Sequence, residues 1–163
     1  MDGMKPIQSL GSLVATLCLA VACGAAAGSA SASPSEHAMM HHAAVDVAGS
    51  KYGQILVDGQ GKALYLFAAD KTTSPTCYDA CATVWPPFLG EKGATVDAMH
   101  AATGSLTGTV TRKDGSVQVT YNGHPLYYYS GDKNPGDVLC QAAVDHGGAW
   151  YVVDPQGNAI TKT

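Results

Sequence analysis

Two aspartates, Asp70 and Asp132, are candidates for acid–base chemistry because they close two similar stretches of the chain. A pair of carboxylates can act as general acid and general base when a fold brings them together. An aspartate at the end of a strand can instead accept backbone amide protons and fix the following turn. Each aspartate occupies the same place in its stretch and is followed by a lysine, which favours the structural role. The sequence has no Ser-His-Asp grouping, phosphate loop or dinucleotide fingerprint, so we predict that the protein is not an enzyme.

Cys77 and Cys81 are four residues apart, and this spacing allows several kinds of chemistry. Outside the cytoplasm, two neighbouring cysteines most simply form a disulfide. On a regular helix, however, Cβ atoms at this spacing are about 5–6 Å apart, whereas a disulfide needs about 3.5–4.5 Å. Either the helix is distorted there, or the bond is strained and easily reduced. A redox-active pair, metal ligation and pairing through Cys140 are the alternatives, and for Cys140 a free thiol and a bridge are both open.

A short tract rich in histidine and methionine precedes the folded part of the chain. Imidazole and thioether groups suit copper, and imidazole also suits zinc and nickel. Such a tract could capture copper in the cell envelope without a preformed site, or it could be an ordinary solvated linker. We predict no cofactor, with copper as the alternative; its ligands would be His37, Met39, Met40, His41 and His42.

The formal net charge of −4 argues against nucleic-acid binding, which needs clustered cations. The aromatic residues of the strand-like segments are interpreted as core residues rather than as a ligand-stacking site. They are Tyr65, Phe67, Trp85, Tyr127, Tyr129 and Trp150. We expect a monomer that meets an unidentified ligand or protein of the cell envelope.

Residues 1–22 have the character of a secretory signal, with an apolar stretch shorter than the roughly 20 residues of a membrane-spanning helix. The segment from Leu19 to Cys23 has the pattern of a lipobox, which predicts lipidation of Cys23 and anchoring to a membrane. Cleavage after Ala32 and simple secretion is the alternative. Residues 23–49 have no apolar period and predict a flexible tether rich in alanine, serine and histidine.

Residues 50–163 form the predicted domain, and they contain a duplication with an offset of 62 residues. The first copy covers about 53–90 and the second about 106–161. In each copy, an alternating apolar run, a turn containing glycine and an aromatic run predict a hairpin. Residues 106–129 predict a three-strand meander, with Asn122-Gly123 as a type I′ turn. In each copy the motif tyrosine and the next aromatic residue share one strand face, while the intervening leucines or tyrosine take the other.

One helix is predicted from Thr76 to Val84, with Ser74 as its cap, Pro75 at its first position and two prolines after it. A second short helical turn is expected within 95–102, and a last strand within 158–161. The fold class is therefore mainly β: a compact antiparallel domain built from two diverged repeats, with one or two short helices.

The doubled Tyr-x-aromatic-x-x-Asp pattern resembles a family of bacterial secreted-repeat lipoproteins of unknown function. The pattern places Tyr65, Phe67 and Asp70 in the first copy, and Tyr127, Tyr129 and Asp132 in the second. The Cys77-to-Pro87 segment, the Asn122-to-Tyr127 segment and Gly147-Gly148-Ala149-Trp150 extend the resemblance over about 53–158. It implies a cell-envelope lipoprotein without an established activity. We expect a non-enzymatic binding or interaction module. The alternative is a redox or copper-handling accessory protein that uses Cys77 and Cys81 together with the tract from His37 to His42.

Overall fold

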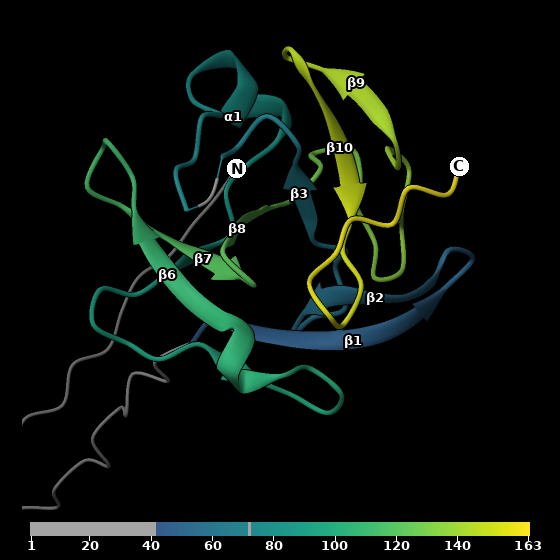
Figure 1. Ribbon diagram of the computed structural model, residues 1–163, viewed down its shortest axis with the longest axis horizontal. Helices are drawn as coiled ribbons and strands as arrows, with labels where there is room; N and C mark the ends of the chain where they lie inside the picture. Colours follow the sequence, from purple (N-terminus) through teal and green to yellow (C-terminus); the bar gives the residue numbers. More distant parts are fainter. Residues whose placement is uncertain (1–41, 72) are drawn as a thin grey trace, which may run out of the picture. The chain divides into compact units, whose positions relative to one another are not determined.

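Ten β-strands, one α-helix and one 3₁₀ helix make up the described part of the chain, residues 42–71 and 73–163 of a computed structural model (Figure 1). In chain order they are β1 (Ala44–Ser50), β2 (Gly53–Asp58), β3 (Tyr65–Phe67), α1 (Ala80–Val84), β4 (Leu89–Gly90), β5 (Asp97–Ala98), η1 (Gly104–Leu106), β6 (Thr107–Thr111), β7 (Val117–Tyr121), β8 (His124–Tyr127), β9 (Ala143–Asp145) and β10 (Gly148–Val152). Strands dominate and only α1 is α-helical within these residues, so the mainly β fold class is confirmed.

The strands form two sheets. One has the order β2-β1-β5, and the other has the order β4-β7-β8-β3-β10-β9, with β6 paired to β7. All strand pairs are antiparallel except β1 with β5. The meander β6-β7-β8 is present as the sequence predicts.

The two copies meet at the antiparallel pair β3 and β8, in the middle of the larger sheet. The register places Tyr65 opposite Tyr127 and Leu66 opposite Leu126. Tyr65 and Tyr127, which are equivalent at the offset of 62, are therefore direct cross-strand neighbours, and Leu66 lies opposite the equivalent of Leu64. Such a pairing relates the copies by an approximate two-fold axis between the strands.

The turn of the β7–β8 hairpin and the loop from β2 to β3 are built from aspartate, asparagine and glycine. Asn122 and Gly123 have φ angles of 48° and 78°, and two positive values are what a type I′ turn requires. In the first copy the predicted hairpin is reduced to an isolated bridge between Val57 and Ala63. Asp58 Oδ1 accepts the amide protons of Gln60 and Lys62, both at 2.9 Å. These contacts hold the chain as it passes from β2 in one sheet to β3 in the other.

Residues 44–49 are not tether, because they belong to β1, which pairs with β2 from Val45 to Ser50. Val45 is fully buried. Burial of this valine and six paired positions with β2 outweigh the small, polar composition that suggests a linker. The folded part of the chain therefore begins before residue 50.

The helix is also shorter than predicted. The segment before Ala80 is held out of helical conformation by tertiary contacts: the Thr76 amide donates to Asp70, and the Cys77 carbonyl accepts from Arg112. Asp79 then has a φ of 52°, which no right-handed helix contains. Ser74 does not cap the helix but forms an isolated bridge with Lys71.

Two further local predictions are wrong. The segment 95–102 contains the strand β5 instead of a helical turn, and the 3₁₀ helix η1 follows it. The predicted strand at 158–161 is reduced to an isolated bridge between Val153 and Ala159.

Alternating residues of β3 and β8 supply the two parts of the core. Tyr65, Phe67 and Tyr127 belong to one buried cluster, with Tyr129 packed against it. Leu64, Leu66 and Leu126 belong to the other, with Tyr128 packed against it. The predicted division of the strand faces is therefore confirmed.

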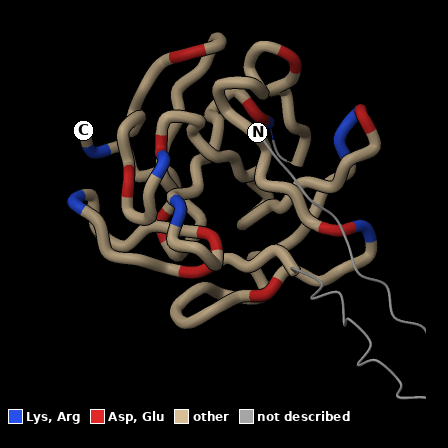
Figure 2. Tube along the Cα trace, turned by 180° about the vertical axis from the view of Figure 1, so that it is seen from behind, with Lys and Arg blue, Asp and Glu red and all other residues tan. Residues whose placement is uncertain are grey.

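No helix among the described residues has the length and apolar character needed to span a bilayer. Figure 2 shows the lysine and arginine residues spread over separate loops, with acidic residues between them.

Candidate functional site

The motif residues of the two repeats bind each other reciprocally. The Tyr65 hydroxyl donates to Asp132 Oδ2 at 2.7 Å, and the Tyr127 hydroxyl donates to Asp70 Oδ2 at 2.7 Å. The tyrosine of each copy is therefore bonded to the aspartate of the other. Asp70 and Asp132 are only 7% and 3% exposed.

The second oxygen of each carboxylate fixes the loop that follows its own strand. Asp70 Oδ1 accepts from the Thr76 amide at 2.8 Å and from the Thr76 hydroxyl at 2.6 Å. Asp132 Oδ1 accepts from the Leu139 amide at 3.0 Å. The sequence indicates this contact to backbone, but it gives no sign of the contact to the opposite tyrosine.

The buried location shifts the acid–base equilibria of the site. Burial raises the pKa of Asp132, and the bonds from Tyr65 and from the Leu139 amide oppose this effect. Burial also raises the pKa of Tyr65 and of Tyr127, and the partner carboxylates add to the shift. Both phenols therefore remain protonated donors well beyond neutral pH.

Two tryptophans occupy the centre of the aromatic cluster between the repeats. Trp85 and Trp150 stack with their ring centroids 4.0 Å apart and their planes 2° from parallel. Tyr65 meets Trp85 edge-on at 5.4 Å, and Tyr127 meets Trp150 edge-on at 5.2 Å.

The second aromatic residue of each motif completes the pattern across the repeats. Phe67 stacks on Trp150 at 4.1 Å, and Tyr129 packs on Trp85 at 4.9 Å. In each motif, the tyrosine contacts the tryptophan of its own copy, and the second aromatic residue contacts the tryptophan of the other copy. The interpretation of these aromatic residues as core residues agrees with this packing.

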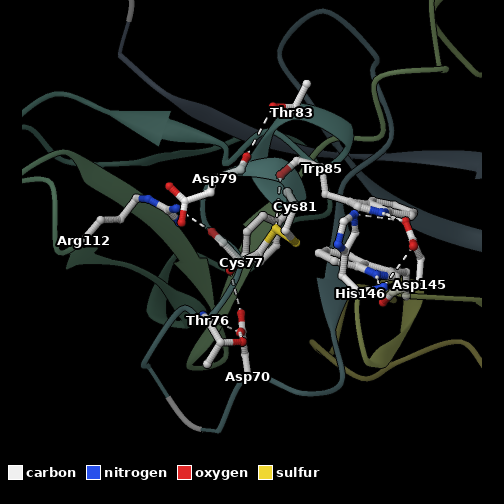
Figure 3. The surroundings of a disulfide bond; sticks show 12 residues. Asp70, Thr76, Cys77, Asp79, Cys81, Thr83, Trp85, Arg112, Asp145 and His146 are labelled. Atoms are coloured by element: carbon white, nitrogen blue, oxygen red, sulfur yellow. Dashed lines mark hydrogen bonds and ion pairs between the residues drawn. A yellow bond between two sulfur atoms is a disulfide. The ribbon is translucent and has the colours of Figure 1, made fainter.

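Asp145 joins the two indoles. Trp85 Nε1 donates to Asp145 Oδ2 at 3.1 Å, and Trp150 Nε1 donates to the Asp145 carbonyl at 3.2 Å. His146 Nε2 lies 3.5 Å from Asp145 Oδ2. Figure 3 shows Asp145 and His146 beside Trp85. The sequence gives no signal for Asp145, since it lies outside both motifs.

Cys77 and Cys81 form a disulfide, with their Cα atoms 5.3 Å apart (Figure 3). Cys77 lies before α1, so the geometry of residues four apart on a regular helix does not apply to the pair. Both cysteines are buried, with exposures of 1% and 8%. Cys140 is a free, half-buried thiol, and its proximity raises the pKa of the Tyr129 hydroxyl.

Arg112 ties the disulfide loop to the meander. Its Nη2 donates to the Cys77 carbonyl at 2.6 Å, and its Nη1 donates to Gln118 Oε1. Gln118, which is fully buried, donates in turn to the Leu126 carbonyl at 2.8 Å. The sequence shows that Arg112 is the one arginine of the chain, but its burial and its partners depend on the tertiary fold.

Several predicted site residues lie outside the described residues. They are the lipidation candidate Cys23 and the metal candidates His37, Met39, Met40 and His41. His42, the last residue of that tract, is half-buried just before β1. Among the residues that the structure describes, no group of three or more metal-ligating side chains is assembled.

Fold and site together define a class: a small two-repeat β domain in which the repeated motif of each copy binds the other copy. The chain belongs to a family described as a secreted repeat of unknown function, which matches residues 47–88 and 108–154. Both Tyr-x-aromatic-x-x-Asp motifs lie within the matched segments, and the predicted family resemblance is confirmed. No curated protein and no solved structure matches the chain.

Proposed function

We propose that the protein is a lipid-anchored component of the cell envelope whose domain acts by binding rather than by catalysis. The observation that carries the proposal is the pair of reciprocal hydrogen bonds between the tyrosine of each repeat and the aspartate of the other. Asp70 and Asp132, the carboxylates best placed by sequence for acid–base work, both use their two oxygens to hold the fold. A catalytic acid or base needs a proton-transfer site that faces its substrate.

Membrane anchoring is supported by the Leu19-to-Cys23 segment, and export is supported by membership of a family of secreted repeats. Mass spectrometry of the native protein gives the direct test. The proposal predicts a mature chain that begins at Cys23 and carries acyl groups, together with loss of the protein from the membrane fraction in Cys23→Ala. A mature chain that begins at Ser33 would contradict anchoring.

The non-catalytic role is tested with Asp70→Asn and Asp132→Asn, which keep the size of the side chain. Both substitutions should lower the melting temperature, because each weakens a bond between the repeats. Control substitutions of exposed aspartates, such as Asp97→Asn, should leave it unchanged. Loss of a measurable activity at unchanged stability would instead establish a catalytic role for these carboxylates.

The disulfide supports a structural rather than a redox role, because Cys77 and Cys81 are both buried. Thiol titration of the native protein with and without mild reductant tests this role. A structural bridge should yield only the thiol of Cys140 among these three cysteines, and release of two more thiols by mild reductant would favour redox chemistry. Copper binding by the tract from His37 to His42 stays a prediction for calorimetry on the mature protein, with a chain lacking residues 36–42 as its control.

A further inference from the structure

One surface pocket has an unusual charge composition for an acidic chain. It encloses about 210 Å³ between the loop before α1 and the β6–β7 turn. Two of its eight lining residues are cations, Arg112 and Lys113, and none is a carboxylate. Two other pockets each contain an aspartate, Asp58 in one and Asp137 in the other.

Arg112 brings a buried positive charge to this pocket, and the carboxylate paired with it is mostly exposed. The residue is 4% exposed, and its two terminal nitrogens bind neutral acceptors. Its Nε is the one buried side-chain nitrogen or oxygen in the described residues without a hydrogen-bond partner. The one carboxylate paired with it, Asp114, lies 3.9 Å from Nε, and its side chain is 60% exposed. Such a buried cation is costly unless an anion approaches it.

Several other lining residues supply hydrogen-bond donors. The Tyr78 ring packs on the guanidinium at 4.2 Å, and Lys113 Nζ lies 5.2 Å from the same ring. The Tyr78 oxygen accepts the Lys113 amide proton at 3.2 Å, so the phenol proton is available for a ligand. Hydroxyl groups of Ser74 and Thr111 also line the pocket.

We propose that this pocket binds a phosphoryl group. Each terminal nitrogen of Arg112 already donates one proton to the protein, and the residue is 4% exposed, so the guanidinium supplies the pocket mainly with positive charge. A tetrahedral group with several oxygens matches the donors that line the pocket, because the Lys113 ammonium, the Tyr78 phenol and the hydroxyls of Ser74 and Thr111 come from separate segments, whereas a planar carboxylate offers only two oxygens. The proposal rests on the binding role given above and names its ligand class.

The test is an NMR titration of the mature chain with inorganic phosphate and with glycerophosphoglycerol, a soluble phosphodiester, at constant ionic strength. Saturable shifts should appear at the amides of Ser74 and of Thr111 to Lys113. Lys113→Ala should weaken binding by about threefold, the effect of losing one exposed charge contact. Asp114→Asn should strengthen binding by a similar factor, because it removes the competing carboxylate.

Lys51→Ala is the matched control. Like Lys113, Lys51 has its Nζ over a tyrosine ring, at 4.9 Å from the centre of the Tyr52 ring, but this lysine lines a different pocket. It should leave both affinities unchanged. Arg112 itself is not substituted, because it also holds the Cys77 carbonyl and Gln118 in the folded state.

Tighter binding of inorganic phosphate would identify the free ion as ligand, whereas tighter binding of the diester would identify a headgroup or polymer phosphodiester. Either result supports the proposal. Absence of saturation in the millimolar range, equal effects of Lys113→Ala and Lys51→Ala, or equally tight binding of acetate would overturn it. The acylation state of Cys23 is measured separately, so failure of phosphate binding is distinguishable from failure of the envelope-anchored role.

Discussion

Replacement of Tyr65 by phenylalanine removes one oxygen atom and leaves the rest of the aromatic cluster in place. Asp132 Oδ2 then loses its donor while the carboxylate stays 3% exposed. A hydrogen bond to a charged group contributes about 1.5–3 kcal/mol, and an unsatisfied buried acceptor adds to the cost of its loss. We therefore expect Tyr65→Phe to lower the free energy of unfolding by about 2–3 kcal/mol. Tyr127→Phe should have a similar effect, because the bond to Asp70 is the equivalent one.

The assay is equilibrium unfolding in guanidinium chloride at pH 7, followed by tryptophan fluorescence and by circular dichroism. Tyr151→Phe is the matched control, because the Tyr151 hydroxyl has no hydrogen-bond partner among the described residues. Its free energy of unfolding should stay within about 0.5 kcal/mol of the wild type. If Tyr65→Phe and Tyr127→Phe also fall within that range, the bonds between the repeats do not stabilise the fold and the reasoning is refuted.

Three other perturbations follow from the structure. Burial raises the pKa of Tyr65, Tyr127 and Tyr128 above the ordinary value of about 10. The free energy of unfolding should therefore keep its full value below pH 10 and fall by about 4 kcal/mol per pH unit above it, because all three phenols ionise in the unfolded chain but not in the folded one. Denaturant titrations between pH 8 and 12 check this fall, and its absence would show that these phenols ionise in the folded state. Replacing both Cys77 and Cys81 by alanine should lower the free energy of unfolding by about 2 kcal/mol, since the closed loop is short, and an unchanged denaturation midpoint would contradict a structural bridge. Gly148→Ala would place a Cβ 2.5 Å from the Phe67 ring and should lower the free energy of unfolding by about 1–3 kcal/mol. Gly49→Ala is the control and should be tolerated, because its nearest contact would be at 3.6 Å. Equal melting temperatures of the two variants would disprove the close packing at Gly148.

The duplication is the part of the fold that the sequence specifies most fully. Matching glycines, apolar positions and motif residues at one offset predict two copies of one β unit, and the pairing of Tyr65 with Tyr127 shows how they combine. The motif aspartates are predicted to serve their own turns, and one oxygen of each does so. The other oxygen binds across the interface, and no local pattern could reveal it because its partner is chosen by strand pairing.

The equivalence of Trp85 and Trp150 escapes the same comparison because these residues are 65 positions apart rather than 62. Their positions become comparable only through the backbone: the Ser130 amide donates to the Val84 carbonyl, and the Ala68 amide donates to the Ala149 carbonyl. The second copy has three more residues than the first between its motif and its tryptophan, so the tryptophans do not align at the offset that aligns the motifs.

Local propensity misleads where tertiary contacts are strong. The segment from Thr76 to Val84 contains no helix breaker, yet contacts to Asp70 and Arg112 hold its first part in an irregular conformation. The opposite error occurs at β1, which continues an alanine-, serine- and histidine-rich segment. Val45 and Val47 alternate there with Asp46 and Ala48, which is a strand signal, and β2 supplies the partner strand. The pocket at Arg112 is likewise formed by segments that only the fold brings together.

The most direct test of the central claim is to divide the chain between the repeats and ask whether either half folds alone. Residues 42–103 and 104–163 would be produced separately and examined by near-ultraviolet circular dichroism, which reports the stacked tryptophans. The structure predicts that neither half gives the signal or unfolds cooperatively alone, and that a one-to-one mixture restores both properties. A half that folds cooperatively on its own would contradict the claim that the two repeats complete each other.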